Sequence, residues 1–535
     1  MTLWHPPEDY TAEERALLAP YFTNLDGPVF ALVNLPEVTK GALFARYSRS
    51  AKPLRRLFLD EFVEDAQRAG GHGAAGGAGV ERAERLYERV FFDYGDDSVA
   101  QLGGVHLACE HSSQILAKVL EWGRLAAYLE QSTRYVPYDD RPGGHFRYTV
   151  PPEVEDAGLA ARFREVCDAA FATYARWLGP MQEHFARLLP LSEGDSEQVQ
   201  RATVRAKACD SLRALLPAAT RTNVGIYATG QAYEQLLLRM RANPLEEVRE
   251  YGETMLVELR KVVPAFLRRV DIPDRGGAWS EYLGRTRDAS ASLAREILEA
   301  APPEPRPEVT LTDHDPEGET KIVAAVLYPH SNLPDDELLA LARRMGADER
   351  AQVLRSASGE RTNRRHRPGR AFERTGYRFD VLCDYGAFRD LQRHRLMTIE
   401  WQELSPEHGF EVPVEVEEVG ALDDWRRTME SSAELWSELR NLGSVAQYAV
   451  AMAYKVRFVM QMNAREAMHV IELRTTPQGH PTYRRVCQKM HSLIAEVHPA
   501  IAEAMSFVDH SGGKEGRLSA ERRSERRRGE AGARS

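Results

Sequence analysis

Apolar residues recur at helical spacing along most of the chain. Three such stripes span residues 115–120, 381–388 and 464–471. In the second stripe the apolar positions are Val381, Leu382, Tyr385 and Phe388. Residues three or four apart share one face of an α-helix, so all three segments are predicted to be helices with one buried face.

Strand patterns are fewer. Residues 309–312 and 377–381 are short runs in which apolar and polar side chains alternate, as in a half-buried β-strand. A helix is expected soon after the first of these strands, around residues 322–325. Long helices combined with few strands predict a mixed α+β fold, with a small sheet in each of two mostly helical units.

Breaks in composition divide the chain. Residues 301–308 are rich in proline and are predicted to connect two segments, residues 1–300 and 309–510. Residues 69–79 are rich in glycine but lack the Lys-Ser/Thr ending of a phosphate-binding loop, which predicts a flexible surface loop. Residues 511–535 hold eight Lys or Arg, four Glu and almost no apolar side chains, which predicts a disordered basic tail.

The overall composition excludes several classes of protein. With 535 residues, 43% of them apolar and 28% charged, the chain has the balance of a globular protein. The net charge of −10 argues against general nucleic-acid binding. Neither a membrane-spanning apolar run nor a signal-peptide pattern is present, so a cytoplasmic location is expected. The five cysteines form no Cys-x-x-Cys pair, which predicts buried reduced thiols rather than a metal site or disulfides.

An internal repeat is visible in the order of helix, arginine, loop, helix, arginine. In the first segment a helix runs into Arg124, and a later helix ends at Arg241 after a turn at Arg213. In the second segment the corresponding helices run into Arg395 and Arg474. Two copies of the same pattern predict an ancient duplication followed by heavy divergence.

Three polar clusters are candidates for chemistry. Residues 393–395 read Arg-His-Arg at a helix end, where positive groups favour a bound anion such as phosphate. Residues 130–135 combine Glu, Ser, Arg and Tyr, of which Arg and Ser suit a phosphate and Glu suits a sugar hydroxyl or a ring N–H. The helix that begins at residue 463 carries two Arg, one His and one Asn on its polar side. Each cluster also has a simpler interpretation, as a solvated helix end, a polar loop or a solvent-exposed face.

Taken together, these clusters resemble the flavin-dependent thymidylate synthases, in outline over residues 90–300 and 309–505. That family carries an Arg-His-Arg triplet, a downstream segment with Glu, Ser, Arg and Tyr, and a later Asn-Ala-Arg segment on a helix that ends in Leu-Arg. Neither segment of this chain has the whole pattern. The first segment matches it at Glu130, Ser132, Arg134, Tyr135 and the turn residue Arg213. The second segment matches it at Arg393, His394, Arg395, Asn463, Ala464, Arg465 and Arg474.

The losses in the two segments are complementary. In the family, a single active site is shared between subunits of a homotetramer. The resemblance therefore implies that the two segments pack as a pseudo-dimer with one intact composite site, and that Trp122 fills the decayed one. A homodimer would then recreate four family units. The altered positions are Trp122 and Gly123 in the first segment and Trp401, Glu403, Ser405 and Pro406 in the second.

The resemblance implies a reductive methylation of dUMP to dTMP. Methylenetetrahydrofolate would give the carbon, FAD the hydride, and NADPH would reduce the flavin; no metal is implied. Catalytic roles are implied for Arg393, Glu130 and Arg474. Nucleotide binding is implied for Glu130, Ser132, Arg134, Arg213, Arg393 and Arg474. Flavin binding is implied for His394, Arg395, Asn463, Arg465, His469 and His366.

Two departures from the family support other interpretations. Asp390 stands where the family has a Gln that contacts the nucleotide, and its negative charge opposes a phosphate ligand. Arg374 replaces a family His. The alternative is a non-catalytic relative that binds flavin or nucleotide and acts as a sensor or assembly partner. A further interpretation is RNA binding through residues 361–370 and the basic tail, which the acidic total and the lack of an aromatic single-strand platform disfavour.

Overall fold

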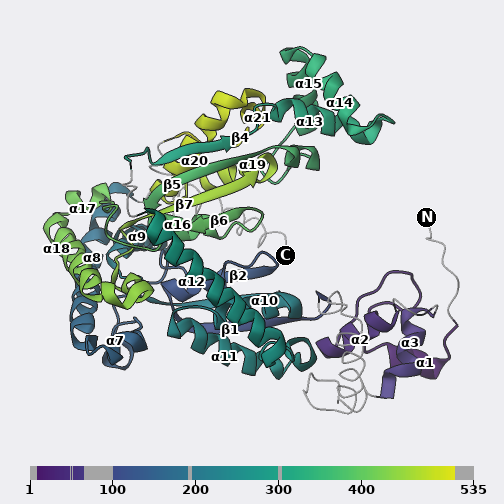
Figure 1. The fold of residues 1–535 in the computed structure, drawn as a ribbon, viewed down its shortest axis with the longest axis horizontal. Coiled ribbons are helices and arrows are strands. Elements are labelled where there is room, and N and C mark those ends of the chain that lie inside the picture. The colour runs from purple at the N-terminus through teal and green to yellow at the C-terminus, as the bar shows by residue number, and fades with distance from the viewer. Residues whose placement is uncertain are drawn as a thin grey trace. The chain divides into compact units, whose positions relative to one another are not determined.

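The computed structural model describes residues 9–47, 50, 52–64, 101–190, 196–298 and 304–511. The predicted glycine-rich loop at 69–79 and the predicted tail after residue 511 lie outside these ranges. Within them the fold is mixed α+β, as the sequence predicted, with mostly helical structure and two small antiparallel sheets (Figure 1). None of the described helices combines the length and the hydropathy that crossing a bilayer requires.

The chain forms two compact units. The first unit contains Met1–Glu110, Leu125–Glu130 and Asn223–Ala301, and the second contains His111–Arg124, Gln131–Thr222 and Pro302–Ser535. The second unit thus combines stretches from both sides of the 301–308 connector. The assignment of residues 1–300 and 309–510 as two related sequence segments stays a prediction.

The first unit is built on a three-stranded sheet with helices around it. The strand order is β1-β3-β2, and β2 pairs antiparallel with β3, so that Ala126 lies opposite Ala228 and Glu130 opposite Val224. The strands are β1 (Gly104–Ser113), β2 (Ala126–Glu130) and β3 (Arg221–Thr229), of which β1 and β3 run on into the second unit at one end. The helices are α1 (Ala12–Leu18), α2 (Glu37–Tyr47), α3 (Leu54–Glu61), α10 (Gly230–Arg241), α11 (Glu246–Arg260) and α12 (Ala278–Leu298).

The second unit contains a four-stranded antiparallel sheet in the order β4-β5-β7-β6. Its strands are β4 (Val309–His314), β5 (Gly376–Asp384), β6 (Thr398–Trp401) and β7 (Lys455–Asn463). Two helices, α19 (Ala464–Arg474) and α20 (Pro481–Val497), pack against this sheet (Figure 1). The other helices from the second segment of the sequence are α13 (Gly318–Leu327), α14 (Asp335–Arg344), α15 (Ala347–Ser358), α16 (Tyr385–Gln392), α17 (Val414–Glu418), α18 (Leu422–Leu439) and α21 (Pro499–Glu503).

Four helices of the second unit come from the first segment of the sequence. They are α6 (Gln114–Leu120), α7 (Pro152–Asp156), α8 (Ala160–Leu188) and α9 (Glu197–Leu212). The long helices α8 and α18 pack together, and the indole N–H of Trp177 donates to a carboxylate oxygen of Asp424 at 2.8 Å. Because both segments of the sequence meet in this unit, side chains far apart in the chain can build a shared site here.

Both sheets contain the same strand order. The order β1-β3-β2 of the first sheet recurs as β5-β7-β6 in the second, where β4 adds one edge strand. In each case the first strand leads directly into a short helix, α6 after β1 and α16 after β5. This common order agrees with the duplicated pattern of helices and arginines in the sequence.

The turn at residues 214–219 and the turn at residues 448–453 form backbone hydrogen bonds with each other inside the second unit. The amide of Ala219 donates to the carbonyl of Tyr448 at 3.0 Å, and the amide of Ala453 donates to the carbonyl of Ala214 at 2.9 Å. A constant numerical shift takes Ala219 to Ala453 and Ala214 to Tyr448, so the two bonds are copies of each other with donor and acceptor turns exchanged. Each turn therefore donates to the other and accepts from it in the same pattern.

The predicted secondary structure is confirmed in outline, but the helices predicted to run into Arg124 and Arg395 end earlier, at Leu120 and Gln392. The stripes at 115–120 and 464–471 lie in α6 and α19, and the strands predicted at 309–312 and 377–381 lie in β4 and β5. The helix predicted from Val381 is wrong, because Val381 and Leu382 lie within β5, which ends at Asp384, and the helix begins only at Tyr385. Asp384 sets this boundary, since its side chain accepts a hydrogen bond from the amide of Ala387 at 2.9 Å and caps α16.

Candidate functional site

Four arginines that the sequence analysis singled out converge in the second unit. Arg213, Arg393 and Arg474 stand at the C-terminal ends of α9, α16 and α19. Arg134 follows β2 in a loop. The helix dipole places partial negative charge at a helix C-terminus and so favours a cation there. This effect stabilises the three arginines at helix ends.

Asp390 lies among these arginines. Its carboxylate forms an ion pair with Arg393, lies 3.6 Å from Nη1 of Arg474 and lies 3.8 Å from Nη2 of Arg213. The Asp390 side chain is only 7% exposed. Burial alone would raise the pKa of this carboxyl, but Arg393, Arg474 and Arg213 together hold it well below its ordinary value. Asp390 is therefore a carboxylate at neutral pH.

Asp210 is a second carboxylate in the same cluster, and the sequence analysis missed it. One of its oxygens lies 3.0 Å from Nε of Arg134, 3.2 Å from Nε of Arg213 and 3.9 Å from Nε2 of His480. Burial raises the pKa of Asp210, whereas Arg134, His480 and Arg213 lower it to about 2. The sequence held a signal for this residue, because Asp210 precedes Arg213 by three positions as Asp390 precedes Arg393.

The remaining nitrogens of Arg213 and Arg134 face acceptors of the chain. Nη1 and Nη2 of Arg213 donate to Oγ1 of Thr133 at 3.4 Å and to the carbonyl of Gly386 at 3.5 Å. Nη1 and Nη2 of Arg134 donate to the Tyr483 hydroxyl at 3.4 Å and to the carbonyl of Gln478 at 3.3 Å. Both guanidinium groups are thereby fixed from several sides.

Arg474 joins this cluster to a group of histidines. Its Nε donates to Nε2 of His394 at 2.9 Å, and Nη2 donates to the backbone carbonyl of Asp390. The ring of His394 lies 5.6 Å from that of His469 between centroids. Burial and the nearby cations, Arg474 first among them, hold the pKa of His394 well below its ordinary value, so this imidazole is neutral.

Ligand atoms of His394, Glu466 and His469 lie within 4.8 Å of one another, a spacing that suits a metal ion. Their surroundings oppose a cation. Burial and then Arg367 lower the pKa of His469 to about 4, and Nη2 of Arg367 is 3.0 Å from its Nδ1. Burial raises the pKa of Glu466 to about 7. Neutral imidazoles can bind a metal ion, but the guanidinium groups of Arg367 and Arg474 beside them favour an anion.

The other residues predicted to bind flavin lie at the edges of this region. Asn463 caps α19 by accepting from the amide of Glu466 at 2.9 Å, and it lines a hollow of about 530 Å³. Arg465 donates to the carbonyl of Pro368 at 2.9 Å. Arg395 and His366 are exposed. The flavin-binding roles of these residues stay predictions.

Glu130 and Ser132 belong to different units. Glu130 ends β2 in the first unit and its side chain is buried, at 7% exposure. Ser132 lies in the second unit, where its hydroxyl accepts from the amide of Arg134 at 3.3 Å. The predicted position of Glu130 between nucleotide and flavin stays a prediction.

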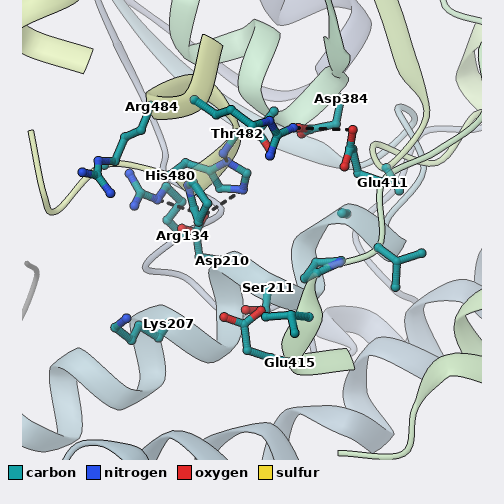
Figure 2. Close-up of a pocket in the computed structure, with 18 of the residues that line it drawn as sticks. Arg134, Lys207, Asp210, Ser211, Asp384, Glu411, Glu415, His480, Thr482 and Arg484 are labelled. Atoms are coloured by element: carbon teal, nitrogen blue, oxygen red, sulfur yellow. Dashed lines mark hydrogen bonds and ion pairs between the residues drawn. The ribbon is translucent and has the colours of Figure 1, made fainter. Parts of the chain in front are cut away.

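A pocket of about 320 Å³ borders the arginine cluster (Figure 2). Figure 2 shows Arg134, Asp210 and His480 together at one wall, with Lys207 and Thr482 also lining the space. His480 stands just before α20, and burial lowers its pKa. Arg134 was predicted from the sequence, whereas His480 was not, because no motif marks the loop between α19 and α20.

Tryptophans occupy two of the positions at which the family pattern is lost. Trp122 and Trp401 meet edge to face with ring centroids 5.8 Å apart, and the Trp122 indole N–H donates to the carbonyl of Ile399 at 3.4 Å. Beside them, Nη2 of Arg124 donates to Oγ1 of Thr398 at 2.9 Å. The prediction that Trp122 fills a decayed site stays a prediction.

Acid is expected to weaken the second unit through Asp210. A carboxyl whose pKa falls from 3.8 to about 2 on folding contributes stability above the higher value and loses it as pH drops through the lower one. The loss amounts to about 2 kcal/mol. Urea unfolding between pH 5 and pH 2.5 should therefore show a smaller acid loss for Asp210→Asn than for the natural chain. Equal losses in the two proteins would contradict this.

Comparisons with known proteins agree with the resemblance found in the sequence. A model of the family described as thymidylate synthase complementing protein matches residues 43–265 and 310–500. A UPF0159 protein of Chlamydia muridarum is 37% identical over 527 residues, which cover 96% of this chain and 98% of the relative. A flavin-dependent thymidylate synthase of Clostridium tetani is 26% identical over 178 residues, covering 33% of this chain and 66% of the relative. Among solved structures, a UMP/dUMP methylase of Streptomyces cacaoi aligns with 39% of this chain and 95% of its own, at 18% identity and a TM-score of 0.30.

Proposed function

Because the chain belongs to the family of thymidylate synthase complementing proteins, we propose that it catalyses the flavin-dependent reductive methylation of dUMP to dTMP. The observation that carries this proposal is the family match, which extends over both segments of the sequence. Methylenetetrahydrofolate is the proposed carbon donor, and NADPH is the proposed reductant of the flavin. The proposed site lies in the second unit, around the arginine cluster.

The charge of the cluster supports a nucleotide substrate. Arg134, Arg213, Arg393 and Arg474 bring four positive charges, and Asp210 and Asp390 bring two negative ones. The cluster keeps a net positive charge, which favours an anionic ligand, and Asp210 and Asp390 reduce that charge. We propose that Arg393 and Arg474 polarise the uracil carbonyls, where preorganised donors stabilise charge that develops in the transition state.

The chemistry of the histidine group fits FAD. When bound, FAD supplies the hydride, and the chain holds the reacting atoms in line. His394 and His469 are neutral donors and acceptors, and Arg367 adds positive charge beside them. Such a set suits the diphosphate of a dinucleotide cofactor. We therefore propose that His394, His469 and Arg465 hold FAD.

A single composite site per chain is the proposed arrangement. Arg134 and Arg213 come from the first segment of the sequence and Arg393 and Arg474 from the second, so a site at the cluster needs both. The exchanged hydrogen bonds between the two turns support a pseudo-dimer, and the contact of Trp122 with Trp401 supports a decayed second site. A homodimer of the chain is proposed on the same grounds.

The contacts of Asp210 and Asp390 favour a second candidate function. Both carboxylates bind arginines that would otherwise face a nucleotide. A non-catalytic relative that binds flavin and acts as a sensor or assembly partner would tolerate this. Bound flavin without dTMP formation would favour this second candidate.

The proposed function predicts one FAD per chain. The purified protein should show flavin absorbance at this stoichiometry, and dUMP should perturb the flavin bands if nucleotide and flavin meet. The variant Glu130→Ala should still bind FAD and should lose the perturbation by dUMP. Two FAD per chain would contradict the single composite site. Absence of flavin, even after reconstitution, would contradict the enzyme.

A further inference from the structure

The arginine cluster already contains its own anion. Asp390 is 7% exposed and forms close contacts with Arg393, Arg474 and Arg213. Arg393 and Arg474 belong to the second segment of the sequence and Arg213 belongs to the first, so Asp390 lies where guanidinium groups from both segments point. A substrate phosphate would seek the same place, because it needs the same convergent donors.

The donors of the cluster are committed to the chain. In Arg213 all three guanidinium nitrogens lie near protein oxygens. In Arg134, Nη1 and Nη2 donate to protein oxygens, whereas Nε lies 3.0 Å from Asp210 without a well-aligned hydrogen bond. In Arg474 the nitrogens face His394, the backbone carbonyl of Asp390 and its carboxylate. A phosphate can enter only by replacing some of these acceptors, and a neighbouring carboxylate repels it at short range.

We propose that Asp390 is a specificity-determining residue that takes the anion position of the arginine cluster, so that the site gains little affinity from a substrate phosphate. This inference rests on the proposed uracil substrate and deepens it. The site then recognises a uracil nucleoside nearly as well as its 5′-monophosphate. Removing the charge of Asp390 restores positive charge at Arg213 for a phosphate and makes the site selective for the nucleotide.

Calorimetric titration with dUMP and with deoxyuridine tests this proposal. The natural protein is expected to bind the two ligands with dissociation constants that differ by no more than about threefold. Asp390→Asn is expected to bind dUMP at least about tenfold more tightly than the natural protein, with deoxyuridine unchanged. Binding of dUMP to Asp390→Asn that is no tighter than to the natural protein would overturn the proposal.

Asp390→Asn leaves arginines without a counter-ion, so the variant is expected to be less stable than the natural protein. A stability measurement tests the proposal in that case. Thermal unfolding is followed in increasing orthophosphate. The matched control is Asp424→Asn, because Asp424 is also a poorly exposed carboxylate, paired with Arg176 at 3.1 Å and with Arg427. Phosphate is expected to raise the melting temperature of Asp390→Asn by several degrees more than that of Asp424→Asn or the natural protein. Equal shifts in all three proteins would overturn the proposal.

The two tests separate this inference from the proposed function. The orthophosphate measurement needs neither flavin nor a methyl donor, and it reports on the arginine cluster alone. Rescue of Asp390→Asn by phosphate in a protein that binds no FAD would contradict the methylation reaction and support the role of Asp390. Formation of dTMP with a strong preference of the natural protein for dUMP over deoxyuridine would support the reaction and overturn the role of Asp390.

Discussion

Replacing Arg213 with alanine is expected to destabilise the second unit by about 3–5 kcal/mol. The Arg213 side chain is 4% exposed and lies between the carboxylates of Asp210 and Asp390. Its removal leaves two buried negative charges with fewer partners, and this costs more than the net worth of the ion pairs themselves. Differential scanning calorimetry, with the transition of the second unit followed separately, measures the loss.

Two further variants make this result specific. Arg213→Lys keeps the charge but cannot reach Asp210, Thr133 and Gly386 at once, so it should recover only some of the stability. Arg176→Ala removes an arginine whose side chain is 59% exposed and which pairs with Asp424. It should cost no more than about 1 kcal/mol. A loss for Arg213→Ala as small as that for Arg176→Ala would show that the cluster adds nothing to folding.

The arginines of this cluster were identified through the resemblance to the family, and three of the four also stand at helix ends, where a cation is favoured. Periodic apolar residues predicted α6 and α19, and the arginines that follow or end such helices are favoured by the helix dipole. The boundary between β5 and α16 was missed because the stripe from Val381 to Phe388 continues across it. A short apolar run has no intrinsic preference for strand or helix, and here the cap at Asp384 decides.

The places of Asp210, Asp390 and His480 in the arginine cluster follow from tertiary structure. Asp210 belongs to the site only because α9 and the loop before α20 lie together, and nothing local in the sequence announces that approach. The Asp-x-x-Arg spacing at Asp210 and Asp390 is visible in the sequence. Only the structure shows that each aspartate forms an ion pair with the arginine three positions later. The burial of His394 could not be predicted from the sequence either. That burial is the largest cause of its lowered pKa, which makes the imidazole neutral.

Arg393→Ala should lower kcat/KM for dTMP formation by about 10²–10³-fold. Its side chain is 34% exposed, but it pairs with the buried Asp390, so the variant should also lose some stability and its rates should be measured well below its melting temperature. The expected loss comes from a guanidinium proposed to stabilise charge that develops on the uracil ring. Steady-state rates, with FAD content measured on the same samples, separate a catalytic loss from a loss of cofactor.

The matched control for Arg393 is Arg124→Ala, which changes the altered counterpart of the Arg-His-Arg triplet. Arg124 donates to Thr398 beside the contact between Trp122 and Trp401, where we propose that no substrate binds. Its loss should change kcat/KM by no more than about threefold. Equal losses for the two variants would mean that both sites are catalytically active and that the duplication has kept two active centres.

The natural protein could instead retain flavin and form no measurable dTMP. That result would identify it as the non-catalytic relative, in which Asp210 and Asp390 have made the arginine cluster a structural element.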